Sequence, residues 1–197
     1  MGMRILFVGT VKFSNYMLET LIDNGAEVVG VITGSDNGLN SDYVDLAPVC
    51  EENEIAILLA DRINEPNVLE WVRKCTPEVI FCMGWSRLIG SELLQLPPLG
   101  VIGYHPAELP HNRGRHPLIW ALVLGLKRTA STFFIMDEGA DSGDIIDQQP
   151  ITIAEDDDAS TLYAKMVEVA QGQINKILPL LTQGNYLRVP QNPAIAN

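Results

Sequence analysis

Short apolar segments alternate with amphipathic segments over the first half of the chain, which is the pattern of a parallel sheet covered by helices. Buried strands are predicted at residues 4–9, 27–33, 55–60, 78–84 and 100–106. Helices are predicted at residues 15–25, 41–54, 65–75 and 90–97. Pro48 falls near the middle of the second helix and should disturb it, because proline has no N–H to donate. This rhythm predicts an α/β fold with an open, twisted, mostly parallel sheet.

The rhythm changes in the second half of the chain. A helix is predicted at residues 116–126. Two strands follow at 130–139 and 144–154, and a Gly-containing turn should join them as an antiparallel hairpin. The longest helical stretch, residues 156–184, has Asp or Ser near its start as a cap and Gly184 at its end.

We expect one domain over residues 1–184, followed by a polar, proline-containing tail over 185–197 that wanders. The chain has 197 residues, 47% of them hydrophobic, which is enough for a core without staples. Its apolar runs are too short to cross a bilayer, and no secretory signal is visible. Three scattered cysteines, Cys50, Cys75 and Cys82, favour free thiols in a reducing compartment. We therefore expect a cytoplasmic protein without a membrane partner.

The formal net charge of −12 disfavours broad nucleic-acid binding, which needs a basic surface. An anionic ligand would need a local cationic pocket, which Arg113 and Arg115 could supply. Ligands of such sheets bind beyond the carboxyl ends of the parallel strands. Three predicted loops reach that edge, namely residues 9–14, 84–90 and 105–117. Neither G-x-G-x-x-G nor the Walker pattern is present, so an NAD dehydrogenase or a P-loop NTPase has no support.

All three histidines, His105, His111 and His116, lie in the third of these loops. Their H-x₅-H-x₄-H spacing matches no zinc signature and no cysteine lies nearby, so we expect no metal site. For His111 and His116 we expect local hydrogen bonds. His105 ends a buried strand at the ligand edge, where it is either a core histidine bonded to the backbone or an acid–base group.

An acid–base histidine needs a carboxylate partner. Candidates crowd the Gly-rich turn between the last two predicted strands, namely Asp137, Glu138, Asp141 and Asp144. Asp and Gly also suit an ordinary solvated turn, and spacing alone does not decide between these interpretations.

The segments GVIGYHPAELPHNRGRHPLIWALVLG and TFFIMDEGADSGDII resemble the formyltransferase family that uses formyl-tetrahydrofolate. That family has an Asn-x-His-x-Ser-Leu-Leu-Pro segment, often followed by Arg-Gly, and later an Asp-x-Gly turn. The opening segment is similar to the start of methionyl-tRNA formyltransferases and amino-sugar N-formyltransferases, and the resemblance covers residues 3–175. It implies a Rossmann-like formyltransferase fold, a catalytic domain over residues 1–184, and formyl-tetrahydrofolate as co-substrate.

The resemblance also implies roles for individual residues. His105 would be the catalytic base or oxyanion partner, and Asp141 would orient it. Leu88 and Ile89 align with residues whose backbone holds the pteridine ring, and we expect Gly139 and Asp141 to contact the folate too. Around the acceptor, the expected contacts are Gly9, Thr10, Lys12, Arg113, Gly114 and Arg115.

One position departs from the family pattern. The catalytic asparagine, two residues before the histidine, is Gly103 here, and Tyr104 cannot replace it because neighbours on a strand face opposite sides. Loss of one oxyanion donor costs roughly 3 kcal/mol. Asn112 could swing in as the donor, a water could fill the gap, or the protein could bind its ligands and catalyse poorly. Glu108 replaces a family leucine and is either a solvated charge or a contact to the acceptor amine.

The identity of the acceptor stays open. Methionyl-tRNA formyltransferases carry a second, C-terminal domain for tRNA; the chain ends before such a domain and is acidic, so we expect no tRNA partner. The first loop lacks the Gly-rich phosphate loop of glycinamide-ribonucleotide formyltransferases. We expect a small amine acceptor, most simply a nucleotide-linked amino sugar whose phosphates meet Arg113, Arg115 and Lys12. The alternatives are a non-catalytic folate- or nucleotide-binding relative and a formyl-tetrahydrofolate hydrolase; a homodimer is one of the open oligomeric states.

Overall fold

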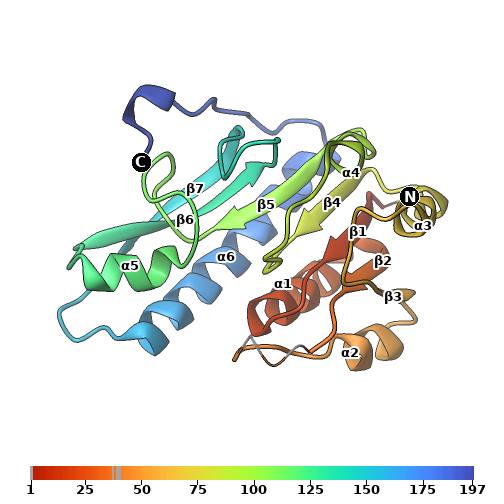
Figure 1. The fold of residues 1–197 in the computed structure, drawn as a ribbon, viewed down its shortest axis with the longest axis horizontal. Coiled ribbons are helices and arrows are strands. Elements are labelled where there is room, and N and C mark those ends of the chain that lie inside the picture. The colour runs from red at the N-terminus through yellow and green to blue at the C-terminus, as the bar shows by residue number, and fades with distance from the viewer. Residues whose placement is uncertain (1, 37, 39–40) are drawn as a thin grey trace. The chain divides into compact units, whose positions relative to one another are not determined.

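The computed structural model describes residues 2–36, 38 and 41–197. The chain forms two compact units, Met1–Ile102 and Gly103–Asn197 (Figure 1). The strand order in the sheet is β3-β2-β1-β4-β5-β6-β7. The predicted fold class, a mostly parallel α/β sheet with an antiparallel hairpin near its C-terminal end, is confirmed.

The first unit is built from alternating strands and helices. Its strands are β1 (Arg4–Val8), β2 (Glu27–Thr33), β3 (Ile57–Leu59) and β4 (Val79–Cys82). Its helices are α1 (Lys12–Asp23), α2 (Ala47–Glu52), α3 (Pro66–Cys75) and α4 (Ser91–Gln95). Strand β1 pairs in parallel with β2 and β4, and β2 pairs in parallel with β3. Fully buried Phe7, Phe81 and Leu18 fill the core, because strands covered by helices need apolar side chains.

The predicted helix over residues 41–54 is wrong in its first half. Helix α2 begins at Ala47, and Pro48 lies in its first turn instead of its middle. The first turn is where proline is tolerated, since the N–H groups there have no partner inside the helix. The proline therefore starts this helix and does not bend it, as Pro66 also does at the start of α3.

Strand β5 (Val101–His105) leads into the second unit. That unit contains β6 (Arg128–Ile135), β7 (Ile145–Thr152), α5 (Pro117–Val123), α6 (Ala159–Thr182) and the short 3₁₀ helix η1 (Pro193–Ile195). The two strands form the predicted antiparallel hairpin. Helix α6 packs on both strands of the hairpin, and α5 packs against α6 (Figure 1). The apolar cluster beneath them consists of Ala121, Ile151, Ile153, Leu162 and Met166.

Helix α6 begins and ends as its sequence predicts. The Asp158 side chain accepts hydrogen bonds from the main-chain N–H groups of Ser160 and Thr161, at 2.8 Å each. These bonds satisfy donors that have no partner within the helix. Gly184 follows the last turn with a φ of +68°, the left-handed conformation that glycine adopts without strain.

The tail, residues 185–197, does not wander as we expect from its composition. Val189 and Ile145 of β7 exchange two main-chain hydrogen bonds, of 2.8 and 2.9 Å. Farther along, the Asn197 side chain accepts a hydrogen bond from the Asn112 N–H at 2.7 Å. The end of the tail accordingly lies beside the loop that follows β5 (Figure 1). Hydrogen bonds to two separate segments therefore hold the tail.

Within the residues that the structure describes, none of the helices combines the length and apolar character that a membrane span requires.

Candidate active site

His105 lies at the end of β5, and its side chain is buried. Its Nε2 is 2.8 Å from the main-chain oxygen of Asn112. Its Nδ1 is 3.6 Å from Oδ2 of Asp141. Both ring nitrogens therefore face oxygen atoms, one from the loop after β5 and one from the turn between β6 and β7. His105 therefore has both a main-chain partner and a neighbouring carboxylate.

The Asn112 carbonyl decides which ring nitrogen of His105 can act. A carbonyl oxygen only accepts hydrogen bonds, so Nε2 must carry a proton and donate it. In the neutral ring, Nδ1 is then the atom that can take up a proton. Asp141 stands on the Nδ1 side, with its Oδ2 3.6 Å from that atom. The geometry thus places the free ring nitrogen beside a carboxylate.

Asp141 is held in a strained turn. Its φ of +52° is left-handed, a conformation that costs a non-glycine residue roughly 1–2 kcal/mol. Its carboxylate accepts a hydrogen bond of 2.9 Å from the Gly114 N–H. Asp137, in contrast, bonds within the turn. Its Oδ1 accepts hydrogen bonds from the Gly139 N–H at 2.9 Å and from the Ser142 hydroxyl at 2.7 Å. The acidic turn thus contains both a structural carboxylate and one directed to His105.

Tyr104 lies on the opposite side of β5, as strand geometry predicts. Its hydroxyl accepts a hydrogen bond from Ser131 at 3.1 Å, and its ring packs edge-on against Phe133 with 5.2 Å between centroids. Burial is the main reason that the pKa of Tyr104 lies above its usual range. Tyr104 is therefore a neutral core residue whose side chain points away from the partners of His105.

The space beside Gly103 is filled by side chains from the strand and turn that follow. A Cβ atom placed on Gly103 would lie 2.8 Å from Cγ of Met136 and 3.0 Å from Cζ of Phe134. At the first distance Met136 would have to move, and at the second Phe134 would have to give slightly. Asn112, the suggested substitute, offers its main-chain carbonyl to His105 and gives its N–H to Asn197.

The loop after His105 is braced by its charged residues. Arg113 directs Nε and Nη2 to the side-chain oxygen of Gln191, at 3.2 and 2.7 Å. Glu108 forms an ion pair with Arg128, with 3.0 Å between Oε2 and Nε, so its charge is already compensated. Gly114 and Arg115 are exposed.

The other two histidines stay apart from this chemistry. The His111 N–H donates to the Glu108 carbonyl at 2.9 Å, and His116 precedes the first turn of α5 with a φ of +56°. Across residues 2–36, 38 and 41–197, no group of three or more His, Cys, Asp or Glu side chains is arranged to hold a metal ion.

The remaining acceptor candidates belong to the first unit. Gly9 has a packing reason for its lack of a side chain, because a Cβ there would lie 2.4 Å from the Met83 carbonyl oxygen. Thr10 is buried and its N–H donates to the Ser14 hydroxyl at 3.0 Å. Lys12 is exposed at the first position of α1. Ligand contacts by these three residues stay a prediction.

Leu88 and Ile89 lie in the loop between β4 and α4. Leu88 is 87% exposed, whereas Ile89 is buried. Asn64 holds their backbone: its Nδ2 donates to the Leu88 carbonyl at 3.0 Å and its Oδ1 accepts from the Gly90 N–H at 2.7 Å. Sequence reasoning missed Asn64, since no motif links it to this loop. Whether Leu88 and Ile89 hold the folate stays a prediction.

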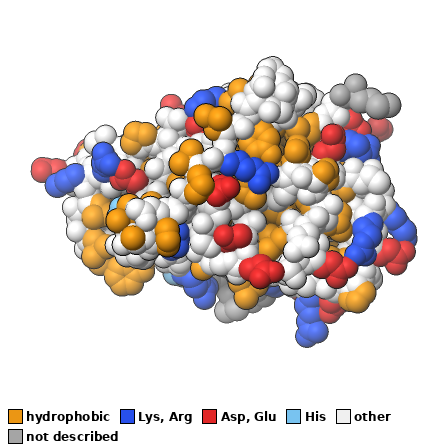
Figure 2. Space-filling model, turned by 90° about the horizontal axis from the view of Figure 1, so that it is seen from above, with side chains coloured by type: hydrophobic (Ala, Val, Ile, Leu, Met, Phe, Trp, Pro, Cys, Tyr) orange, Lys and Arg blue, Asp and Glu red, His pale blue; other side chains and the backbone are white. Residues whose placement is uncertain are grey.

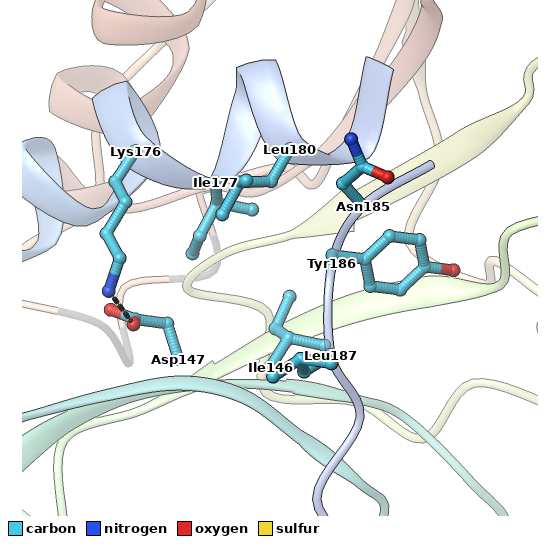
Figure 3. A pocket seen from close by; sticks show the side chains of 8 residues that line it. All are labelled: Ile146, Asp147, Lys176, Ile177, Leu180, Asn185, Tyr186 and Leu187. Atoms are coloured by element: carbon cyan, nitrogen blue, oxygen red, sulfur yellow. Dashed lines mark hydrogen bonds and ion pairs between the residues drawn. The ribbon is translucent and has the colours of Figure 1, made fainter. Parts of the chain in front are cut away.

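A cavity of about 230 Å³ lies in the second unit, between β7, α6 and the start of the tail (Figure 3). The lining combines the Asp147–Lys176 ion pair with apolar side chains such as Ile177 and Leu187. None of the site residues predicted from the sequence lines it. Its volume is below the roughly 300–1,000 Å³ of ordinary ligand pockets.

Gln191 is a further site neighbour that sequence reasoning missed. Besides accepting from Arg113, it donates from Nε2 to the main-chain oxygens of Asp141 at 2.9 Å and Gly143 at 2.7 Å. A glutamine in a polar tail carries no pattern that could have revealed these contacts.

Comparisons with known proteins identify the family of the chain. The family model described as Formyl transferase matches residues 3–178. A methionyl-tRNA formyltransferase from Caldanaerobacter subterraneus subsp. tengcongensis is 32% identical over 190 residues, which cover 94% of this chain and 62% of that protein. The chain thus spans less than two thirds of the length of this curated relative.

Two solved structures share the fold. Phosphoribosylglycinamide formyltransferase from Bacillus halodurans has a TM-score of 0.80 at 24% identity, covering 92% of this chain and 96% of that one. An N-formyltransferase from Helicobacter canadensis, solved with folinic acid and dTDP-3-aminofucose, has a TM-score of 0.75 at 18% identity, covering 99% and 70%. Because the family model matches most of its length, the chain belongs to the formyl transferase family.

Proposed function

We propose that the protein transfers a formyl group from formyl-tetrahydrofolate to the amine of a small acceptor, most simply a nucleotide-linked amino sugar. The observation that carries the proposal is the buried His105 with Asp141 beside its Nδ1. Membership of the formyl transferase family supports the reaction class. Amino-sugar transfer is supported by the fold shared with the Helicobacter canadensis enzyme.

In this reaction the acceptor nitrogen bonds to the formyl carbon, the bond from that carbon to the folate nitrogen breaks, and the acceptor amine loses a proton. Because Nε2 of His105 is engaged by the Asn112 carbonyl, Nδ1 is the ring atom that takes this proton. Asp141 stabilises the charged ring. The family's alternative role for His105, the oxyanion partner, requires a hydrogen on Nδ1, so this atom cannot also act as the base in the same step.

A second candidate acceptor is the methionyl group on tRNA, which the 32% identical relative from Caldanaerobacter favours. The net charge of −12 argues against it, because tRNA binding relies on neutralising phosphates. The acceptor panel below therefore includes methionyl-tRNA beside nucleotide-linked amino sugars and glycinamide ribonucleotide.

The test is formyl-tetrahydrofolate turnover with this panel, for the wild type and His105→Ala. We expect one nucleotide amino sugar to be formylated and the substitution to lower kcat by about 10²- to 10⁴-fold, the contribution of a general base. Folate binding, followed by fluorescence or calorimetry, should persist in the variant. His111→Ala is the matched control and should keep full turnover. The main-chain N–H of His111 donates to the Glu108 carbonyl in the same loop, and an alanine keeps that N–H.

Each alternative gives its own result. Formate release without any acceptor would identify a hydrolase. Folate binding without turnover of any acceptor would identify a non-catalytic relative. Formylation of methionyl-tRNA alone would replace the amino-sugar proposal with the second candidate.

A further inference from the structure

The Gln191 carboxamide joins the two segments that flank His105. Its oxygen accepts from Arg113 Nε at 3.2 Å and Nη2 at 2.7 Å, so it holds the loop after β5. Its nitrogen donates to the carbonyls of Asp141 at 2.9 Å and Gly143 at 2.7 Å, so it also holds the turn between β6 and β7. One side chain therefore uses both ends of its amide to connect loop and turn.

The link acts where the turn is strained. Asp141 keeps its left-handed φ of +52° only while surrounding contacts hold it, because the conformation is unfavourable for a residue with a Cβ. That conformation directs its carboxylate to Nδ1 of His105, 3.6 Å away, and to the N–H of Gly114 at 2.9 Å. Hydrogen bonds to the carbonyls of Asp141 and Gly143 fix the backbone from which the carboxylate extends.

Gln191 is itself held in place. Two residues before it, Val189 forms an antiparallel bridge to Ile145, with hydrogen bonds of 2.8 and 2.9 Å. After it, Asn197 bonds the loop through the N–H groups of Asn112 at 2.7 Å and Arg113 at 3.0 Å. The tail is therefore anchored on both sides of Gln191, which gives its amide a defined position.

We propose that Gln191 is a positioning residue of the transfer site, which keeps the Asp141 carboxylate at His105 by hydrogen bonds to the turn. The proposal rests on the proposed function, since it assigns Gln191 to that reaction. Gln191 acts on the chemistry through Asp141. Its loss should therefore lower kcat more than it weakens the binding of formyl-tetrahydrofolate, which the same turn is expected to contact.

The first test compares Gln191→Ala with the wild type. We expect kcat to fall about ten- to a hundredfold, the effect of misplacing a catalytic group, and KM for formyl-tetrahydrofolate to rise by a smaller factor. Gln183→Ala is the matched control, because Gln183 is an exposed glutamine that closes α6 and should leave both constants unchanged. An unchanged kcat in Gln191→Ala would overturn the proposal.

Gln191→Glu separates the two halves of the contact. A glutamate still accepts from Arg113 but cannot donate to the carbonyls of Asp141 and Gly143. If the turn is what matters, this nearly isosteric variant should lose kcat as the alanine variant does. Wild-type kcat in Gln191→Glu would overturn the role of the turn, and it would do so even if Gln191→Ala failed to fold.

Amide hydrogen exchange gives a readout that does not depend on turnover. Peptides covering residues 137–144 should exchange faster in Gln191→Ala and Gln191→Glu, and at the wild-type rate in Gln183→Ala. If the wild type formylates no acceptor, the proposed function fails, but this measurement still shows whether Gln191 holds the turn. Unchanged exchange in both Gln191 variants would overturn the role of Gln191, whether or not the protein formylates an acceptor.

Discussion

Gly103 is closely packed by its neighbours. A Cβ at this position would lie 2.8 Å from Cγ of Met136 and 3.0 Å from Cζ of Phe134. The resemblance to the family implies an asparagine at this point of β5, on the same side as His105. An asparagine here would therefore require Met136 to move and Phe134 to shift slightly.

This packing leads to a prediction for Gly103→Asn. We expect the substitution to destabilise the protein by about 1–3 kcal/mol, the usual cost of overpacking, and to leave kcat no higher than in the wild type. Urea denaturation and steady-state kinetics measure the two effects.

The double variant Gly103→Asn/Met136→Ala is the control. Removing the Met136 side chain should relieve the contact, so the two substitutions together should cost less than the sum of their separate effects, by about 0.5 kcal/mol or more. Strict additivity would show that the clash with Met136 is not the cause.

At this scale, the sequence made some residues of the candidate site predictable and others not. Spacing alone left four carboxylates open as partners of His105. The resemblance to the family singled out Asp141, which the structure places 3.6 Å from the ring. Asn64 and Gln191 were not accessible, because each acts through a side-chain amide on a main-chain group far along the chain. Such contacts depend on the folded backbone and leave no periodicity in the sequence.

Among the elements, α6 has the most explicit local signals. Asp158 accepts two main-chain N–H groups, and Thr161 returns a hydrogen bond by accepting from the Asp158 N–H at 2.9 Å. The Thr161 N–H is the main reason that the pKa of Asp158 lies below its usual range. Because a carboxylate with a lowered pKa in the folded state binds fewer protons than in the unfolded state, it adds stability above the unfolded-state pKa.

The expected consequence is an acid-sensitive cap. The stabilising contribution of Asp158 should be complete at neutral pH and should disappear as the pH falls below about 4, through the lowered pKa of the folded state. Asp158→Asn keeps a capping oxygen but does not titrate in this range. We expect it to resemble the wild type in melting temperature at pH 7 and to lose less stability between pH 5 and pH 3.

Asp158→Ala is the comparison that isolates the cap itself. It should melt below the wild type at pH 7, and the difference between the two melting temperatures should narrow toward pH 3 because both proteins then lack the charged cap. Thermal unfolding followed by circular dichroism measures this difference across the pH range. A difference that widens toward low pH would contradict the role of Asp158 as a charged cap.

For the whole molecule, the formal charge is strongly negative. The chain carries 13 Lys and Arg against 25 Asp and Glu. On the face shown in Figure 2, basic side chains stand among acidic and apolar ones. With this excess of acidic residues, we expect little gain from releasing counterions from nucleic acid.

We therefore expect no saturable binding of bulk tRNA at about 150 mM salt, with any residual affinity weaker than about 10⁻⁴ M. Filter binding at several salt concentrations measures this. Saturable binding with a steep decrease between about 50 and 200 mM salt would contradict the expectation and favour the methionyl-tRNA acceptor. Arg115→Ala, which removes an exposed charge of the loop after β5, would then show whether that loop contributes.

The architecture was more predictable than its details. Apolar runs bounded by glycine or proline predicted β1, β2, β4 and β5, because strands buried on both faces need unbroken apolar sequence. Pro48 misled the prediction of α2, since proline fits a helix start as well as it disturbs a helix middle. The order of the tail was missed because its hydrogen bonds go to distant main-chain groups and not to an apolar face.

The position of Gln191 in the chain also has a consequence for synthesis. Gln191 follows Asp141 by 50 residues. At the ribosomal rate of roughly 5–20 residues per second, about 3 to 10 s pass between the two. A nascent chain therefore has its histidine loop and acidic turn before it has the amide that connects them. The link between the loop and the turn can therefore form only after Gln191 has been synthesised, 50 residues after Asp141.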